Sequence, residues 1–434
     1  MDILQDPAPG NKRRWLMIGL ASLSALLSWF CRNSLTVIFP DISQDLNLSA
    51  QDLGLLSSIF FYFFAGCQLP LGFLLAKLGV RSVMTVGILL AALGCVLFAL
   101  APSAYMALAG RALIGMGTSV SVMGGMVVAA LWFSTAHFAL LSGIIMGVAG
   151  IGSLLATSPW VVLVHAIGWR SSMLIVAVVL FLVTIACFAI MRNPSKEQLS
   201  VMQENRFSLK QAAKSILFSI RFWIMGLNTC CRYGFLSTLQ AVWAGPLLIY
   251  GLGLSQFATA NILLLLAIGY MLGMPLMGIM SDRWFTSRKW VVCCGQLLLA
   301  GLAFSFLWWG PNTPMWVIVF TFVLLPLLSA AGNAVFAHVK EINPPEFAPA
   351  AIAWTNIFPM LGGAIFIQIT SLFLPADVTS IGSPQDLSHL WWLGGIAAGI
   401  TGICYALFIP ESPAMLRLRE RRRQLKEGSS AGVR

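Results

Sequence analysis

The stretch SVMTVGILLAALGCVLFALA (residues 82–101) contains no charged side chain. A helix rises about 1.5 Å per residue, so this run is long enough to cross a hydrocarbon core of about 30 Å. Similar runs recur along a chain that is 59% hydrophobic and 9% charged, whereas soluble proteins carry about 25% charged residues. The runs are longer than barrel strands and do not alternate, so helices must satisfy the backbone. The sequence therefore predicts an all-α, multi-pass membrane protein.

Twelve runs of this kind are predicted to be transmembrane helices. They cover residues 15–39, 53–76, 82–101, 104–131, 139–164, 171–191, 222–250, 256–280, 290–310, 315–337, 348–374 and 390–410. No cleavable signal peptide is expected, because the basic stretch NKRRW (residues 11–15) runs directly into a span longer than a signal-peptide core.

The positive charges favour one orientation in the membrane. With the N-terminus placed in the cytoplasm, nearly all of the 26 Lys and Arg residues fall in cytoplasmic loops and termini, and only Arg170 falls in a loop on the other side. Cytoplasmic loops of membrane proteins carry such an excess, so both termini are expected to be cytoplasmic. The basic tail RLRERRRQLK (residues 417–426) is interpreted as a solvated anchor at the lipid surface rather than a nucleic-acid site.

A long polar segment divides the chain into two halves. The predicted organisation is a cytoplasmic N-terminus (residues 1–14), a six-helix bundle (15–191), a cytoplasmic linker (192–221), a second six-helix bundle (222–410) and a basic cytoplasmic tail (411–434). The halves repeat weakly, since residues 47–82 and 253–289 share a Leu-Ser opening, an apolar run, a Pro shortly before a Gly, and basic residues. Such duplication is typical of secondary transporters with a substrate site between the halves.

Three motifs resemble the major facilitator superfamily. The stretch GFLLAKLGVRSV (residues 72–83) is similar to the family's loop between helices 2 and 3 through Gly72 and Arg81, with Ala76 in place of the family's acid. The second-half copy, GIMSDRWFTSRK (residues 278–289), keeps Gly278, Asp282 and Arg283. The third motif, GRALIGMGTSV (residues 110–120), resembles the family's helix 4 through Arg111, Gly115 and Gly117. The resemblance implies twelve helices in two pseudo-symmetric bundles that transport by alternating access.

The second-half loop is predicted to act as a conformational latch. Asp282 lies just past a span and beside Arg283, where a charge cluster can hold two helix ends together in one state and release them in the other. Gly278 would permit the close helix approach that this requires. Glu411, just after the last span, could replace the acid that the first-half loop lacks. The alternative interpretation is plain solvated charge at a helix end.

Three arginines lie within the predicted spans, namely Arg32, Arg111 and Arg232, and no Asp or Glu does. An Arg near the bilayer centre costs about 2.5 kcal/mol or more. The spans offer no carboxylate to neutralise Arg32 and Arg232, so a bound anion could supply the counter-charge. Arg32 lies in predicted helix 1 and Arg232 in helix 7, its equivalent in the other half.

Two arginines in these positions could clamp an anionic substrate by bidentate hydrogen bonds. The arrangement is similar to the organic-phosphate/phosphate antiporters of the family, which hold their substrate between arginines on helices 1 and 7. The alternatives are snorkelling to an interface and pairing with backbone carbonyls. For Arg111, the resemblance implies proton coupling or bracing of helices.

Polar side chains in the spans supply further candidates for the substrate site. The candidates are Tyr62, Gln68, Tyr233, Gln240, Trp243, Asn261, Tyr270, Asn333, Asn356 and Gln368. Gln240, Tyr233 and Asn356 are preferred, with Tyr62 beside them, because Gln240 shares a helix face with Arg232 and Asn356 lies in a helix expected to line the cavity. Each of these side chains could equally join helices by hydrogen bonds.

The sequence shows no metal-ligand spacing of His and Cys, no nucleophile with a base, and no phosphate-binding loop. We therefore expect a transporter without cofactor, metal or enzymatic activity, moving a small organic anion such as a carboxylate, phosphate ester or sulfonate. Coupling could be by anion exchange or by protons carried on the substrate. The alternatives are an exporter of amphipathic compounds, a porter of an anionic chelate such as a siderophore, and a ligand sensor. A monomer in a bacterial inner membrane is expected by resemblance.

Overall fold

The computed structural model describes residues 12–133, 135–193, 215–344, 347–373 and 381–431, and within these residues all regular structure is helical. The helices of the first half are α1 (Lys12–Asn33), α2 (Phe39–Leu46), α3 (Ala50–Ala99), α4 (Ala104–Thr118), α5 (Val120–Trp132), α6 (Thr135–Leu155), α7 (Ser158–Ile167) and α8 (Trp169–Ile190). Those of the second half are α11 (Ile220–Thr238), α12 (Ala244–Pro246), α13 (Gln256–Ile279), α14 (Arg288–Ser305), α15 (Met315–Ala331), α16 (Ala334–Ile342), α17 (Ala348–Thr355), α18 (Ile357–Leu372), α19 (Ser388–Phe408) and α20 (Pro413–Ala431).

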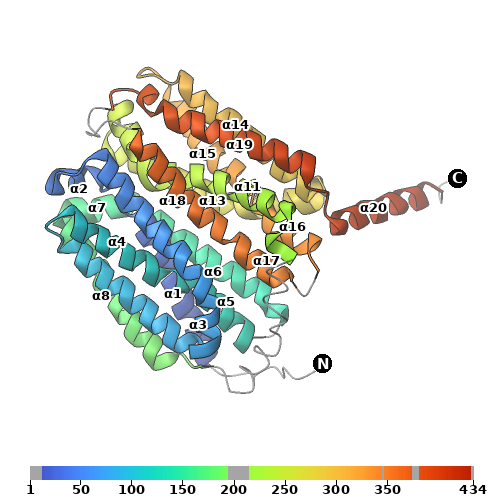
Figure 1. The fold of residues 1–434 in the computed structure, drawn as a ribbon, viewed down its shortest axis with the longest axis horizontal. Coiled ribbons are helices and arrows are strands. Elements are labelled where there is room, and N and C mark those ends of the chain that lie inside the picture. Colours follow the sequence, from blue (N-terminus) through green and yellow to red (C-terminus); the bar gives the residue numbers. More distant parts are fainter. Residues whose placement is uncertain (1–11, 134, 194–214, 345–346, 374–380, 432–434) are drawn as a thin grey trace. The chain divides into compact units, whose positions relative to one another are not determined.

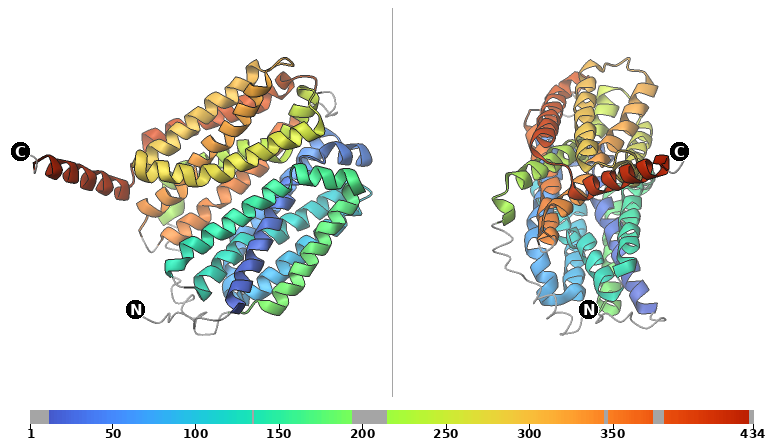
Figure 2. Two further views of the ribbon diagram at one scale, coloured as in Figure 1. Left: turned by 180° about the vertical axis from the view of Figure 1, so that it is seen from behind. Right: turned by 90° about the vertical axis from the view of Figure 1, so that its right-hand side faces the viewer.

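The helices confirm the predicted fold class. Among the described residues, nine helices are long and apolar enough to cross a membrane, or up to eleven if each of two bent pairs is one span. All twelve predicted runs overlap helices, several of which are broken, as between α4 and α5 and between α15 and α16. After α19 the chain continues as α20, which extends away from α14 and α19 in Figure 1 and in the left view of Figure 2. The chain is thus a multi-pass helical membrane protein.

The chain folds into two compact units. The first contains residues 1–206, 237–267 and 364–383, and the second contains residues 207–236, 268–363 and 384–434. Three helices, α11, α13 and α18, therefore contribute residues to both units. Most of the predicted linker lies outside the described residues, and the predicted division into two six-helix bundles stays a prediction.

One helix, α3, replaces the loop expected between the second and third spans. The break in α3 is confined to Gly79, whose φ of 79° and ψ of 161° lie outside the helical region. A positive φ costs glycine little, so one residue suffices for the change of direction. Asn193 supports this break, because its side-chain oxygen accepts the Arg81 backbone N–H at 2.9 Å and its amide donates to the Leu78 carbonyl at 3.2 Å.

Helices α3 and α4 pack along a seam of glycines, and Figure 1 shows them running side by side. Gly87 and Gly94 of α3 face Gly117 and Gly110 of α4, respectively. A Cβ added at Gly110 would lie 2.7 Å from the backbone nitrogen of Phe98. Small residues at a helix interface allow backbones to approach closely, and the resulting van der Waals contacts favour helix association in lipid.

We predict that Gly110→Ala destabilises the protein by about 1–3 kcal/mol, because the added methyl group would overlap backbone atoms that cannot move independently. Thermal unfolding of the detergent-solubilised protein measures this effect. Gly147→Ala in α6 is the matched control, since a Cβ at Gly147 meets no atom within 4 Å. Equal melting temperatures for the two variants would contradict the prediction.

Candidate functional site

The guanidinium group of Arg232 is held inside the second unit by neutral groups. Only 1% of Arg232 is exposed. One terminal nitrogen donates to the Ser329 carbonyl at 2.5 Å and to the Ser329 hydroxyl at 3.2 Å, and the other donates to the Asn333 side-chain oxygen at 3.2 Å. Asn333 in turn donates to the Tyr270 hydroxyl at 3.4 Å. All of these acceptors are uncharged, so the positive charge of Arg232 is not neutralised by them.

A break between α15 and α16 makes room for this arginine. Gly332 follows α15, and a Cβ at this position would overlap the Arg232 side chain. The last carbonyls of a helix have no partner within the helix. The Ser329 carbonyl lies in the final turn of α15 and accepts both the Arg232 side chain and the Gly332 backbone N–H. The break thus supplies the space and the acceptor.

Asn228 lies one turn before Arg232 on the same face of α11. It is fully buried, and neither its side-chain nitrogen nor its side-chain oxygen has a hydrogen-bond partner among the described residues. The Nε–H of Arg232 also has no such partner. The sequence analysis missed Asn228, although a polar residue four positions before an intramembrane arginine was the available signal.

Arg32 occupies the last turn of α1 in the first unit. It is 8% exposed, and its guanidinium carbon lies 4.6 Å from the centre of the Trp29 ring. A cation over an indole face is stabilised by the ring quadrupole. The C-terminal end of a helix also favours positive charge. Helix α1 therefore ends in a position that favours a buried cation.

Arg111 braces two helices of the first unit. Its Nε donates to the Leu56 carbonyl of α3 at 3.2 Å, and a terminal nitrogen donates to the Cys31 carbonyl of α1 at 2.8 Å. The group also lies 4.9 Å from the centre of the Phe60 ring. Because Cys31 directly precedes Arg32, these contacts fix the end of α1 that carries Arg32. They agree with the bracing role predicted for Arg111, which stays a prediction.

The structure places Gln240 near the end of α1. With Asn33, Thr36 and Ser153 it lines a cavity of about 10 Å³ in the first unit. The Gln240 carbonyl accepts the Thr36 hydroxyl at 2.8 Å, and Asn33 donates to the Ser153 hydroxyl at 2.8 Å. A volume of about 10–15 Å³ accommodates no more than one water molecule, so this cavity is too small for a substrate in this structure.

The other preferred residues fall in separate units. Arg32 and Tyr62 belong to the first unit, whereas Arg232, Tyr233 and Asn356 belong to the second. Tyr62 is 38% exposed and Tyr233 is 7% exposed. Asn356 follows α17, and its backbone N–H donates to the Ile352 carbonyl. The two predicted anion-binding arginines are thus each described within their own unit.

Several of the other polar candidates join helices in this structure. Gln368 accepts the Ser58 hydroxyl at 2.8 Å, Asn261 accepts the Ser158 hydroxyl at 2.7 Å, and the Trp243 indole N–H donates to Thr370 at 3.0 Å. Gln68 donates to the Ser119 carbonyl at 3.4 Å. These contacts match the helix-joining alternative, while Tyr270 and Asn333 belong to the Arg232 cluster.

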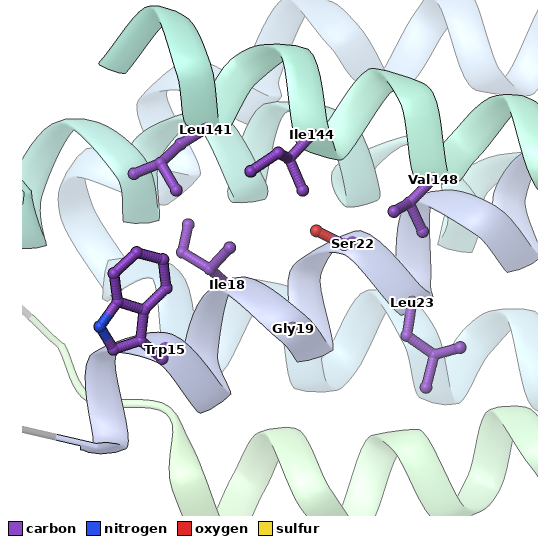
Figure 3. Close-up of a pocket in the computed structure, with 8 residues that line it drawn as sticks. All are labelled: Trp15, Ile18, Gly19, Ser22, Leu23, Leu141, Ile144 and Val148. Carbon is purple, nitrogen blue, oxygen red and sulfur yellow. The ribbon is translucent and has the colours of Figure 1, made fainter. Parts of the chain in front are cut away.

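An apolar groove of about 400 Å³ lies between α1 and α6. Figure 3 shows Trp15 and Ile18 on one side and Leu141, Ile144 and Val148 on the other. Ser22 supplies the only side-chain oxygen among the eight lining residues. A lining of this kind suits a hydrocarbon chain and does not suit an anion, so it is not the predicted site.

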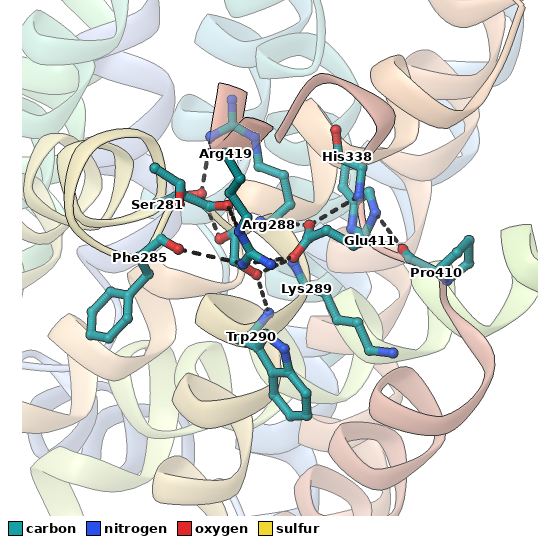
Figure 4. A network of polar contacts seen from close by, with 12 residues as sticks. Ser281, Phe285, Arg288, Lys289, Trp290, His338, Pro410, Glu411 and Arg419 are labelled. Carbon is teal, nitrogen blue, oxygen red and sulfur yellow. Dashed lines mark hydrogen bonds and ion pairs between the residues drawn. The ribbon is translucent and has the colours of Figure 1, made fainter. Parts of the chain in front are cut away.

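A network of charged and polar groups joins the start of α14 to the ends of α16 and α19 (Figure 4). Arg288 forms ion pairs with Asp282 and, at 3.1 Å, with Glu341. Glu411 accepts the Ser287 hydroxyl, and its other oxygen accepts the Arg288 backbone N–H at 3.0 Å. The cluster therefore centres on Arg288 rather than on the predicted Arg283.

Arg283 and Gly278, two residues of the predicted latch, make different contacts from those expected. The carbonyl of Arg283 accepts Arg422 at 2.7 Å, and a Cβ at Gly278 would meet no atom within 4 Å. The close approach expected at Gly278 is therefore not made in this structure, nor is one made at Gly72. In the first half, Arg81 of α3 donates to the Phe188 carbonyl at 2.9 Å, which joins α3 just past its break to the end of α8.

Glu411 is stabilised as a carboxylate. Burial alone would raise its pKa, but hydrogen bonds from the Ser287 hydroxyl and from the backbone N–H groups of residues 288, 289 and 412 outweigh burial and lower the pKa. Arg419 adds an ion pair at 3.5 Å. Sequence reasoning singled out neither Glu341 nor Arg288, because their pairing depends on contacts between helices.

Comparison with known proteins shows what the chain resembles. A probable sulfoacetate transporter of Cupriavidus necator is 27% identical over 70% of this chain and 73% of the relative. The galacturonate transporter of Dickeya chrysanthemi is 26% identical over 66% of this chain and 89% of the relative, and the hexuronate transporter of Escherichia coli K12 is 24% identical over 81% and 87%.

Solved structures show the same fold. A bacterial homologue of the human lysosomal transporter Spinster has a TM-score of 0.75 at 15% identity, and a D-xylose–proton symporter has 0.74 at 14%; each match covers 92% of this chain and 98% of the other. The family model of the Major Facilitator Superfamily matches residues 21–367. The chain, a multi-pass helical membrane protein, belongs to the Major Facilitator Superfamily of transporters.

Proposed function

We propose that the chain is a secondary transporter that moves a small organic anion by alternating access, with Arg32 and Arg232 binding the anionic group. The observation that carries the proposal is the environment of Arg232, which is 1% exposed and hydrogen-bonded to neutral acceptors. Inside a protein, charges are usually paired, because an uncompensated charge in a low dielectric is costly. A carboxylate, phosphate ester or sulfonate supplies the missing charge.

The geometry of Arg232 leaves capacity for such a ligand. A guanidinium group carries five N–H donors in a fork that matches planar anions. The terminal nitrogens donate to Ser329 and Asn333, while Nε–H has no partner among the described residues. The neutral contacts therefore orient the group, and an anion can still be bound through its remaining donors.

Arg32 is the proposed second contact. Its guanidinium carbon lies 4.6 Å from the centre of the Trp29 ring, a contact that stabilises the cation. Arg111 holds the preceding carbonyl and would position Arg32 without touching the substrate. Gln240, Tyr233, Asn356 and Tyr62 are proposed to hydrogen-bond the rest of the substrate.

The relatives support an anionic substrate. Their names include sulfoacetate, galacturonate and hexuronate, which carry sulfonate or carboxylate groups. We propose a monomer in a bacterial inner membrane with both termini in the cytoplasm. Transport would be coupled to a counter-transported anion or to protons carried on the substrate, since the sequence has no carboxylate within its predicted spans.

We predict that carboxylates, phosphate esters or sulfonates raise the melting temperature of the purified wild-type protein. Arg32→Ala and Arg232→Ala should each weaken the apparent affinity about tenfold to hundredfold, because a hydrogen bond to a charged group contributes about 1.5–3 kcal/mol. Arg170→Ala is the control, since Arg170 is a half-exposed arginine that pairs with Asp45. Uptake by proteoliposomes tests flux with the same variants.

Each other outcome points to a different function. Stabilisation by lipophilic cations alone would favour an exporter of amphipathic compounds. Anion binding without flux would favour a sensor. If anions shift the melting temperatures of wild type and of both arginine variants equally, neither Arg32 nor Arg232 binds the anion.

The network around Glu411 is proposed to be the conformational latch, and its stability should depend on pH. Because the folded-state pKa of Glu411 is lowered, its contribution is complete above the ordinary Glu pKa of about 4.3 and is lost as pH falls through the folded value. We predict that Glu411→Gln lowers the free energy of unfolding by about 1 kcal/mol at pH 7, and that the difference from wild type shrinks below pH ~4.

Thermal unfolding between pH 3.5 and 8 measures this difference. Glu420→Gln is the control, because Glu420 is an exposed glutamate on α20. A difference between wild type and Glu411→Gln that stays constant down to the lowest pH would contradict the proposed stabilisation of the ionised carboxylate.

A further inference from the structure

We propose that Asn228 is a specificity-determining residue that reads a hydroxyl group next to the anionic group of the substrate. The inference rests on the proposed function, since it takes Arg232 as the anion contact. Asn228 is fully buried, and neither polar atom of its side chain has a hydrogen-bond partner among the described residues. A buried polar group without a hydrogen bond destabilises a fold.

The neighbours of Asn228 on the same face of α11 lie in two different environments. Met225, one turn before Asn228, belongs to an apolar cluster with Val335 and Val339 of α16. One turn after Asn228, Arg232 reaches Ser329 and Asn333 around the break between α15 and α16. Residues three and four apart lie on one helix face. Asn228 therefore stands between an apolar core and the cationic cluster.

Three unpaired groups lie within one helical turn. They are the amide donor and the amide acceptor of Asn228 and the Nε–H donor of Arg232. Two donors and one acceptor, beside a full positive charge, match a 2-hydroxy acid. A carboxylate oxygen can accept from Arg232 and from the Asn228 amide, while the neighbouring hydroxyl donates to the Asn228 oxygen.

The same chemistry disfavours anions without that hydroxyl. A site whose buried polar groups are made for a substrate hydroxyl leaves them unpaired when the hydroxyl is missing, so the analogue binds more weakly. Asn228 and Arg232 lie one turn apart on the same face of α11, so the proposal places one ligand in contact with both side chains. The preferred substrates are thus hydroxylated acids, such as sugar acids, rather than simple sulfonates or carboxylates.

The test uses two pairs of anions that differ only in the 2-hydroxyl group: gluconate with 2-deoxygluconate, and glycolate with acetate. Their affinities for the purified full-length protein are measured by calorimetry and by thermal stabilisation. Wild type should prefer the hydroxylated member about fivefold to tenfold, as expected for one or two additional hydrogen bonds. Asn228→Leu, of similar size but apolar, should bind both members within about twofold of each other.

Gln296→Leu is the matched control. Gln296 is a buried amide on α14 that donates to Thr401 of α19 at 3.1 Å, and its replacement should leave the preference intact. Asn228→Ser serves as a second variant if Asn228→Leu does not fold, because the shorter side chain cannot span both contacts. Its preference should fall to the same level.

The outcomes separate the two proposals. If wild type binds anions without preferring the hydroxylated members, the role of Asn228 is overturned and the anion site stands. If Asn228→Leu weakens the binding of both members of each pair by the same factor, the preference for the hydroxylated member is unchanged. Asn228 is then a structural residue and the inference fails. If no anion in this set or in the wider panel stabilises wild type, the proposed function fails, and the inference fails with it.

Discussion

The cost of placing a guanidinium group among apolar helices governs the rest of this structure. Each of the three arginines in the spans predicted from the sequence is buried, and each is accommodated at a particular place. Arg232 and Arg111 donate to backbone carbonyls at or near the ends of α15 and α1, and Arg32 lies over the Trp29 indole in the last turn of α1. Helix ends expose carbonyls that would otherwise lack partners, so broken helices and buried arginines satisfy each other's requirements.

Backbone carbonyls satisfy geometry but not charge. A carbonyl oxygen accepts a hydrogen bond from an arginine, yet it leaves the full positive charge in place. Both Arg111 and Arg232 are held by neutral acceptors, but they differ at Nε–H. The Nε–H of Arg111 donates to the Leu56 carbonyl of α3, whereas the Nε–H of Arg232 has no partner among the described residues. The first arrangement is suited to bracing a fold. The second is suited to receiving a ligand that carries the opposite charge.

The fold could be predicted from the sequence because long uncharged runs have few alternatives in lipid. The helix breaks could not, since they depend on tertiary contacts: α3 continues past Gly79, and the chain interrupts α15 at Gly332. The arginines were recognisable as rare charges in apolar runs. Asn228 offered only its spacing of four positions from Arg232, because its missing hydrogen-bond partners can be seen only in the structure. Arg288 was not singled out, because its acids, Asp282 and Glu341, converge only in space.

The glycine seam between α3 and α4 has a consequence for sequence variation. A contact made by side chains can vary in both directions, since substitutions either remove or add atoms. At Gly87, Gly94, Gly110 and Gly117 there is nothing left to remove, and every substitution adds atoms where backbones already touch. Every substitution at these four positions therefore increases the volume of the side chain. In a library of functional variants they should stay glycine, while the lipid-facing residues of the same two helices exchange freely among apolar types.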